Sequence, residues 1–202
     1  MLTNSTSFKI RIILFTIGLC LPFFVFSQAK KPGSIEYLKL CNGFKQISLG
    51  TDIYMLPGNN LTFLDGEYKV DADSCVKYEY KDFDLLKMGD NLTLNLIGFR
   101  TFKNKIVNIY LFFKRADGYK VLSNFISTYG VFTERPDSYM DIYNWNSSKV
   151  TLSLRYELKL DYGVAIFTSK SVEQEIETMK EIKAMKKMEA LQASFQKMSL
   201  QY

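Results

Sequence analysis

The chain of 202 residues contains no histidine. A Ser-His-Asp or Cys-His catalytic arrangement needs an imidazole as its general base, and a His-containing zinc site needs one as a ligand, so these sites are excluded. The glycine-rich patterns GxxxxGKS/T and GxGxxG, whose loops hold nucleotide phosphates, are also missing. We therefore expect a protein that is not an enzyme and has no catalytic residues, no metal site and no cofactor.

Residues 1–27 are predicted to be a secretory signal peptide. Lys9 and Arg11 precede an apolar run from Ile12 to Phe26, and Ser27 suits cleavage before Gln28. The run is shorter than the about 20 residues that a membrane-spanning helix needs. The segment resembles the export signals of Gram-negative envelope proteins, which implies a periplasmic or extracellular protein. The alternative is an uncleaved anchor, and only then would the protein have a membrane contact.

Without residues 1–27 the chain keeps 175 residues, enough for one domain with a core.

The positive charge of this remaining chain is modest. The 26 basic residues less Lys9 and Arg11 leave 24, against 21 acidic residues, a net charge of +3. This charge is too small and too evenly spread to indicate a nucleic-acid partner.

Cysteines are few as well. Loss of Cys20 with the signal peptide leaves Cys41 and Cys75, which cannot complete a four-thiolate metal site. An exported protein resides where disulfides form, so we expect a Cys41–Cys75 bridge. Two buried free thiols are the alternative.

Sequence patterns typical of β-strands are abundant. From Val150 to Leu158 apolar and polar residues alternate, which places one face of a strand in a core and the other in water. A turn at Asp161-Tyr162-Gly163 then leads into the partner strand Val164–Phe167. Lys105–Phe113 is apolar on both faces apart from Asn108, which predicts a central strand. Asn42-Gly43 predicts another hairpin between short apolar pieces.

Two segments have helical periodicity. Apolar residues recur at i, i+3, i+4 and i+7 within Tyr119–Tyr129, which predicts a short helix on one face of the sheet, ending at Gly130. We thus expect an α+β protein: a flexible leader at residues 28–34, a domain at 35–170 with an antiparallel sheet of six to eight strands, and a long C-terminal helix at 171–202.

The C-terminal helix contains no proline or glycine and carries two apolar stripes. The first is formed by Val172, Ile176 and Met179. The second is rotated by roughly a third of a turn at 100° per residue, with alternating spacings of four and three: Ala184, Met188, Leu191, Phe195 and Met198. We expect the first stripe to pack on the domain. The second either folds back on the same domain or contacts a protein partner or a second copy, with Met188, Leu191 and Phe195 as binding residues.

Tyr143 and Trp145 lie on one face of a predicted strand. Exposed aromatic side chains beside a carboxylate could stack on sugar rings, and packing in the core is the alternative. The order of a helix ending at Tyr129-Gly130 and then Trp145 before two strands is similar to small exported α+β domains of Gram-negative envelopes. We expect an envelope protein that binds another macromolecule; a carbohydrate-binding or glycan-cleaving protein and a membrane-anchored subunit of an envelope complex are the alternatives.

Overall fold

The structure is a computed structural model that describes residues 31–64, 73–89, 91–136, 141–156 and 161–199, with side chains as far as Gln196. The predicted signal peptide, its cleavage site and residues 28–30 of the leader lie outside the described residues, as does the side chain of Met198.

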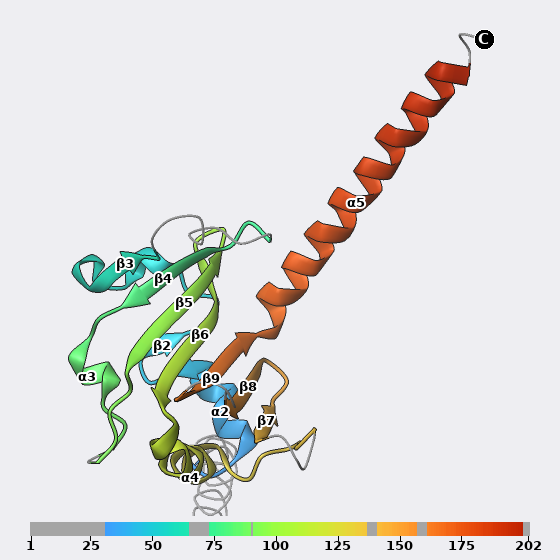
Figure 1. Cartoon of the computed structure of the whole chain (residues 1–202). Coiled ribbons are helices and arrows are strands. Elements are labelled where there is room, and N and C mark those ends of the chain that lie inside the picture. The colour runs from blue at the N-terminus through green and yellow to red at the C-terminus, as the bar shows by residue number, and fades with distance from the viewer. Residues whose placement is uncertain (1–30, 65–72, 90, 137–140, 157–160, 200–202) are drawn as a thin grey trace, which may run out of the picture. The chain divides into compact units, whose positions relative to one another are not determined.

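Seven strands form one antiparallel sheet (Figure 1). Across the sheet they run in the order β3 (Leu61–Phe63), β4 (Val76–Tyr80), β5 (Leu96–Phe102), β6 (Lys105–Lys114), β9 (Tyr162–Ser169), β8 (Val150–Tyr156) and β7 (Ile142–Asn146). The α+β class and the predicted strand number are confirmed. The strand that is apolar on both faces, β6, is the middle one, and β8 buries Val150, Leu152 and Leu154 as its alternation predicts.

One face of the sheet carries the main core. Helix α4 (Gly118–Tyr129) buries Val121, Phe125 and Tyr129 there, which confirms the predicted short helix. Gly130 ends α4 with φ +83° and donates its N–H to the carbonyl of Ile126, so the residue of positive φ that ends the helix is a glycine, as expected. The same core is closed by smaller elements: α2 (Ile35–Cys41), the hairpin β1 (Gly43–Phe44) and β2 (Ile47–Ser48), and α3 (Phe83–Leu86). The short 3-10 turns are η2 (Ile53–Met55), η3 (Gly58–Asn60) and η5 (Arg115–Asp117).

The segment before Asn42 differs from the prediction. It is helix α2, not a strand, and Asn42 is its C-cap with φ +48°. The side chain of Ser34 caps the start of the helix by accepting a hydrogen bond from the N–H of Tyr37. The hairpin does form, but slightly later in the chain than predicted, with Phe44 paired to Ile47. Asn favours the left-handed conformation in both settings, so the dipeptide alone could not distinguish a hairpin from a helix end.

The opposite face of the sheet carries a second, smaller core. Helix α5 (Lys170–Ser199) places Val172 and Ile176 there, against Phe102 and Val107, with Met179 at the edge. Arg100 pairs with Asn108 and the next residue, Thr101, pairs with Ile106, so Val107 is an extra residue in β6. A bulge of this kind can turn an additional side chain to one face. It supplies Val107 to the α5 side, and the first apolar stripe of α5 packs on the domain as predicted.

The predicted disulfide is wrong: Cys41 and Cys75 are not bonded to each other. Cys41 ends α2 and packs half-buried against the main core, whereas Cys75 is fully buried in the second core with Val172 and Ile176. A disulfide needs Cα atoms within about 7 Å of each other. The two cysteines belong to different cores, and an even count of cysteines carries no information about which face of a sheet each one occupies.

Candidate functional site

Trp145, predicted as a binding residue, is fully buried. Its Nε1 donates a hydrogen bond of 2.7 Å to the carbonyl oxygen of Gly130, and the rings of Phe125 and Phe132 meet it edge-on. Tyr143 is half-buried with its ring centroid 5.0 Å from that of Phe132. These two aromatic residues therefore belong to the packing beneath α4, and they do not form an exposed surface for sugar rings.

The first three turns of α5 are fixed to the sheet by charge as well as by apolar contact. Arg100, a nearly buried residue of β5, donates hydrogen bonds to Asp73 at 2.7 Å and to Glu173 of α5 at 3.3 Å. Lys180 of α5 lies 3.0 Å from Asp73 and 2.8 Å from Glu177. Hydrogen bonds to Glu177 and then to Asp73 raise the pKa of Lys180 to about 12. Because these partners come from the sheet side and from the helix, they set the direction in which α5 leaves the domain.

After Lys180 the helix has no cover in the described part of the chain. Every described side chain from Glu181 to Gln196 is exposed, and Figure 1 shows this half of α5 continuing beyond the sheet. The predicted binding residues are among them: Met188 is 59% exposed, Leu191 45% and Phe195 65%. Large apolar side chains that are more than 40% exposed on one element form an unusual surface, since a domain normally buries such groups.

Two more apolar residues of α5 are exposed. Ile182 is 37% exposed and Met185 60% exposed. We call the set Met185, Met188, Leu191 and Phe195 the exposed stripe; Ile182 lies nine residues before Leu191 and therefore on the opposite side of the helix. The spacing of four and three that runs from Ala184 to Met198 does not include Ile182 and Met185. The spacing of three between Met185 and Met188 is the sequence signal that could have identified Met185, whereas Ile182 lies six residues before Met188.

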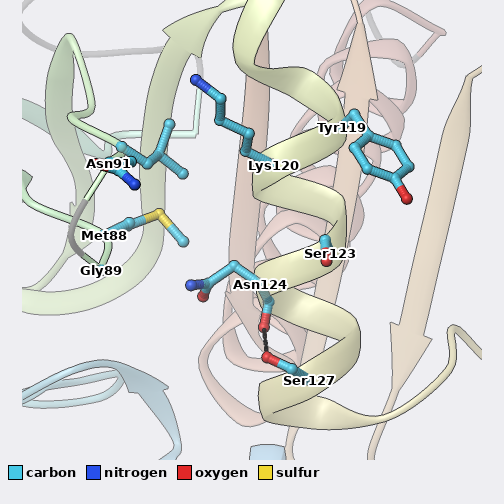
Figure 2. A pocket seen from close by; sticks show the side chains of 9 residues that line it. Met88, Gly89, Asn91, Tyr119, Lys120, Ser123, Asn124 and Ser127 are labelled. Carbon is cyan, nitrogen blue, oxygen red and sulfur yellow. Dashed lines mark hydrogen bonds between the residues drawn. The ribbon is translucent and has the colours of Figure 1, made fainter.

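A second feature is a groove of about 520 Å³ between α4 and the residues that precede β5. Figure 2 shows Lys120 and Asn124 of α4 facing Met88 and Asn91 across it, and Tyr119 is also among the residues that line it. The Nζ of Lys120 is held by the Asp117 carboxylate at 2.7 Å. The groove thus offers amide and ammonium groups for hydrogen bonding a polar ligand, and the sequence prediction had not identified it.

A smaller cavity of about 240 Å³ adjoins this groove and is lined by Cys41, Tyr37 and Tyr129. A hydrogen bond with Cys41 raises the pKa of Tyr37, and burial raises the pKa of Tyr129. Lys45, which also lines the cavity, donates to the backbone carbonyls of Asp84 and Leu85, and its burial lowers its pKa. Phenols whose pKa is raised hold their protons near neutral pH, so they are poor general bases for activating the thiol.

Over the ranges that the structure describes, no three His, Cys, Asp or Glu side chains lie close enough together to hold a metal ion. Within the same ranges, no helix has the length and apolar character needed to cross a membrane. Comparison with protein-family models, with curated proteins and with solved structures found no significant match to this chain.

Proposed function

We propose that this protein is an exported, non-enzymatic protein of the cell envelope that binds another macromolecule through the exposed stripe of α5. One observation carries the proposal: a helix of 30 residues is anchored to its domain by its first turns and presents the large apolar side chains of the exposed stripe to solvent. Burying a Met, Leu or Phe side chain contributes about 1.5–3 kcal/mol, so a partner that covers the stripe gains a substantial free energy of binding.

The carbohydrate alternative has less support. It depends on an exposed face containing Tyr143 and Trp145, and Trp145 makes all of its contacts inside the core. The export part of the proposal rests on the N-terminal sequence. It is tested by the intact mass of the protein purified from the envelope fraction of cells that express the full chain: a species beginning at Gln28 supports it, and retention of residue 1 favours the anchored alternative.

The binding part is tested by crosslinking in living cells. A photoreactive amino acid is placed at Met188, within the exposed stripe, or at Ala190, which is exposed on the other side of α5. We expect irradiation to give a discrete adduct from position 188 and none from position 190. A chain that ends after Lys183 should co-purify with none of the material that the intact chain retains.

The two positions are matched because both side chains are exposed and they lie only two residues apart on the same helix. Equal labelling at both positions indicates random encounters and counts against a specific surface. Absence of any adduct from position 188, with the protein folded and present at the same level, refutes the proposal that the exposed stripe is the binding surface.

A further inference from the structure

We propose that the groove beside α4 and the cavity that adjoins it form one binding site for an uncharged glycoside, with the apolar group in the cavity and the sugar ring in the groove. The walls of the site come from α2, α4 and the segment before β5, so it does not involve the exposed stripe of α5. Three features carry the inference: a buried hydroxyl group without a partner, an aromatic inner wall, and an outer wall of uncharged polar groups.

The buried hydroxyl group belongs to Tyr129. Its side chain is 5% exposed and lines the cavity together with Tyr37 and Cys41, but its hydroxyl makes no hydrogen bond to the described residues. Every fully enclosed side-chain nitrogen or oxygen in the described ranges has a hydrogen-bond partner, so this oxygen faces the open space of the cavity. Burial raises the pKa of the phenol, which therefore keeps its proton for donation. A polar group that is buried without a protein partner is costly, and a ligand that accepts its hydrogen bond removes that cost.

The inner wall fits an apolar ring. The cavity of about 240 Å³ is lined by the side chains of four aromatic residues: Tyr37, Phe44, Phe125 and Tyr129. An apolar cavity of about 150 Å³ suffices to bind benzene in another protein, so a phenyl group fits here. Met88 lines both the cavity and the groove, which lets one molecule extend from the first into the second.

The outer groove, of about 520 Å³, offers the groups that recognise sugar hydroxyls. Asn124 lines both spaces, and its half-buried side-chain amide makes no hydrogen bond to the described residues. An amide both donates and accepts hydrogen bonds, and so does a sugar hydroxyl. Ser123 adds a hydroxyl group, and Tyr119, which is 81% exposed, adds an aromatic ring on which a sugar can stack.

The charges around the site favour an uncharged ligand. Among the described residues that line the groove and the cavity there is no Asp or Glu, so no carboxylate is present to bind a cation. Lys45 donates to three backbone carbonyls at the C-terminal end of α3, which use all of its protons. Lys120 is paired with the Asp117 carboxylate at 2.7 Å. Both ammonium groups are thus already bound by protein oxygens, and an anion gains little from either.

The test uses phenyl β-D-glucopyranoside, which joins a phenyl ring to a neutral sugar, and the protein purified from cells expressing the full chain. Isothermal titration calorimetry is expected to give a dissociation constant on the order of 100 μM, as for a small ligand of average efficiency. Glucose and phenol each fill only one part of the site and are expected to bind about tenfold more weakly or worse. Phenyl β-D-glucuronide, which carries a carboxylate, is expected to bind no more tightly than the glucoside.

Two variants locate the ligand. Tyr129→Phe keeps the ring, removes the unpartnered hydroxyl, and is expected to weaken binding about fivefold. Asn124→Ala is expected to weaken it by about the same factor, and it remains informative if Tyr129→Phe perturbs folding, because alanine favours the helix. Tyr156→Phe removes the same atom from a tyrosine that lines neither the groove nor the cavity, and is expected to leave binding unchanged.

Cys41 provides an independent readout, because it lines the cavity. Modification by N-ethylmaleimide, followed by peptide mass spectrometry, is expected to slow about tenfold at Cys41 when the glucoside is present at about ten times its dissociation constant. Cys75 is fully buried in the second core and is the internal control, whose modification should not respond to the glucoside.

Four results would overturn the inference. The glucoside may give no binding up to about 10 mM, or glucose or phenol alone may bind as tightly as the glucoside. Binding that neither protects Cys41 nor weakens in Tyr129→Phe and Asn124→Ala places the ligand elsewhere on the protein. A glucuronide that binds about tenfold more tightly than the glucoside refutes the uncharged class. The role of α5 is decided separately, by crosslinking at position 188.

Discussion

The two halves of α5 should differ sharply in their contribution to stability, and a matched pair of substitutions measures the difference. Ile176 is 1% exposed and packs in the second core, whereas Met188 is 59% exposed on the same helix. We expect Ile176→Ala to destabilise the folded domain strongly and Met188→Ala to have almost no effect, because only the first side chain is removed from water by folding.

The magnitude follows from the atoms removed. Ile176→Ala deletes three buried carbon atoms, worth about 2.4 kcal/mol at about 0.8 kcal/mol for each, before any cavity is counted. The second core is small and its sheet side is rigid, so the gap closes only in part, and the total should lie near 3 kcal/mol, within the about 2–5 kcal/mol known for such substitutions. Met188→Ala should stay within about 0.5 kcal/mol, as for most surface substitutions.

Urea unfolding provides the assay, since the single tryptophan, Trp145, is buried in the main core and reports its opening by fluorescence. With a slope of about 2 kcal/mol per molar urea, a loss of 3 kcal/mol lowers the midpoint by about 1.5 M. Circular dichroism at 222 nm follows α5 in the same samples and detects separate melting of the helix. Equal losses for the two variants would falsify the two-part description of α5, because Met188 would then be packed on its own domain.

Three further predictions concern groups that fold the domain. Arg100→Gln should lower the free energy of unfolding by about 2–3 kcal/mol in the same urea assay. The loss is smaller than for breaking a fully buried ion pair, because the carboxylate partners of Arg100 are 27% and 36% exposed. Lys103→Gln should lower the free energy of unfolding by less than about 1 kcal/mol. Trp145→Phe leaves the Gly130 carbonyl without its indole donor and should cost about 1–3 kcal/mol or more, measured by circular dichroism. Burial raises the pKa of Tyr156 to about 12 from its ordinary 10. The contribution of the neutral phenol to the free energy of unfolding is therefore complete below pH 10 and is lost as the pH rises towards 12. In the variant Tyr156→Phe, the free energy of unfolding should fall less over that pH interval.

Elements with a long or strict period were predictable from the sequence. The alternation of Val150, Leu152 and Leu154 identified β8, and the apolar character of Lys105–Phe113 on both faces placed β6 at the centre, because only a strand covered on both sides can bury both sets of residues. The absence of proline and glycine after Ser171 sufficed for α5. For each of these elements, the local sequence pattern favours the same secondary structure that the tertiary packing requires.

What failed depends on contacts between distant residues. Helix α2 has only seven residues, too few to establish a period, so the sequence around Asn42 predicts a hairpin turn where the structure has a helix end. The groove beside Lys120 is formed by segments about 30 residues apart, and no local pattern indicates that they meet. The ion pairs of Arg100 join β5 to Asp73 and to α5, and a single arginine in an apolar strand does not reveal its partners.

The anchored half of α5 also affects how its exposed half can bind. A helix segment of about 15 residues is only marginally stable in water, because its first turn is costly to form. In this protein the first turns of α5 are already held by Val172, Ile176 and the ion pairs around Arg100, so the exposed half extends an existing helix. A partner therefore meets a preformed surface and has less conformational entropy to overcome. The stability of the second core and the affinity of the exposed stripe are thus physically linked, although they involve different residues.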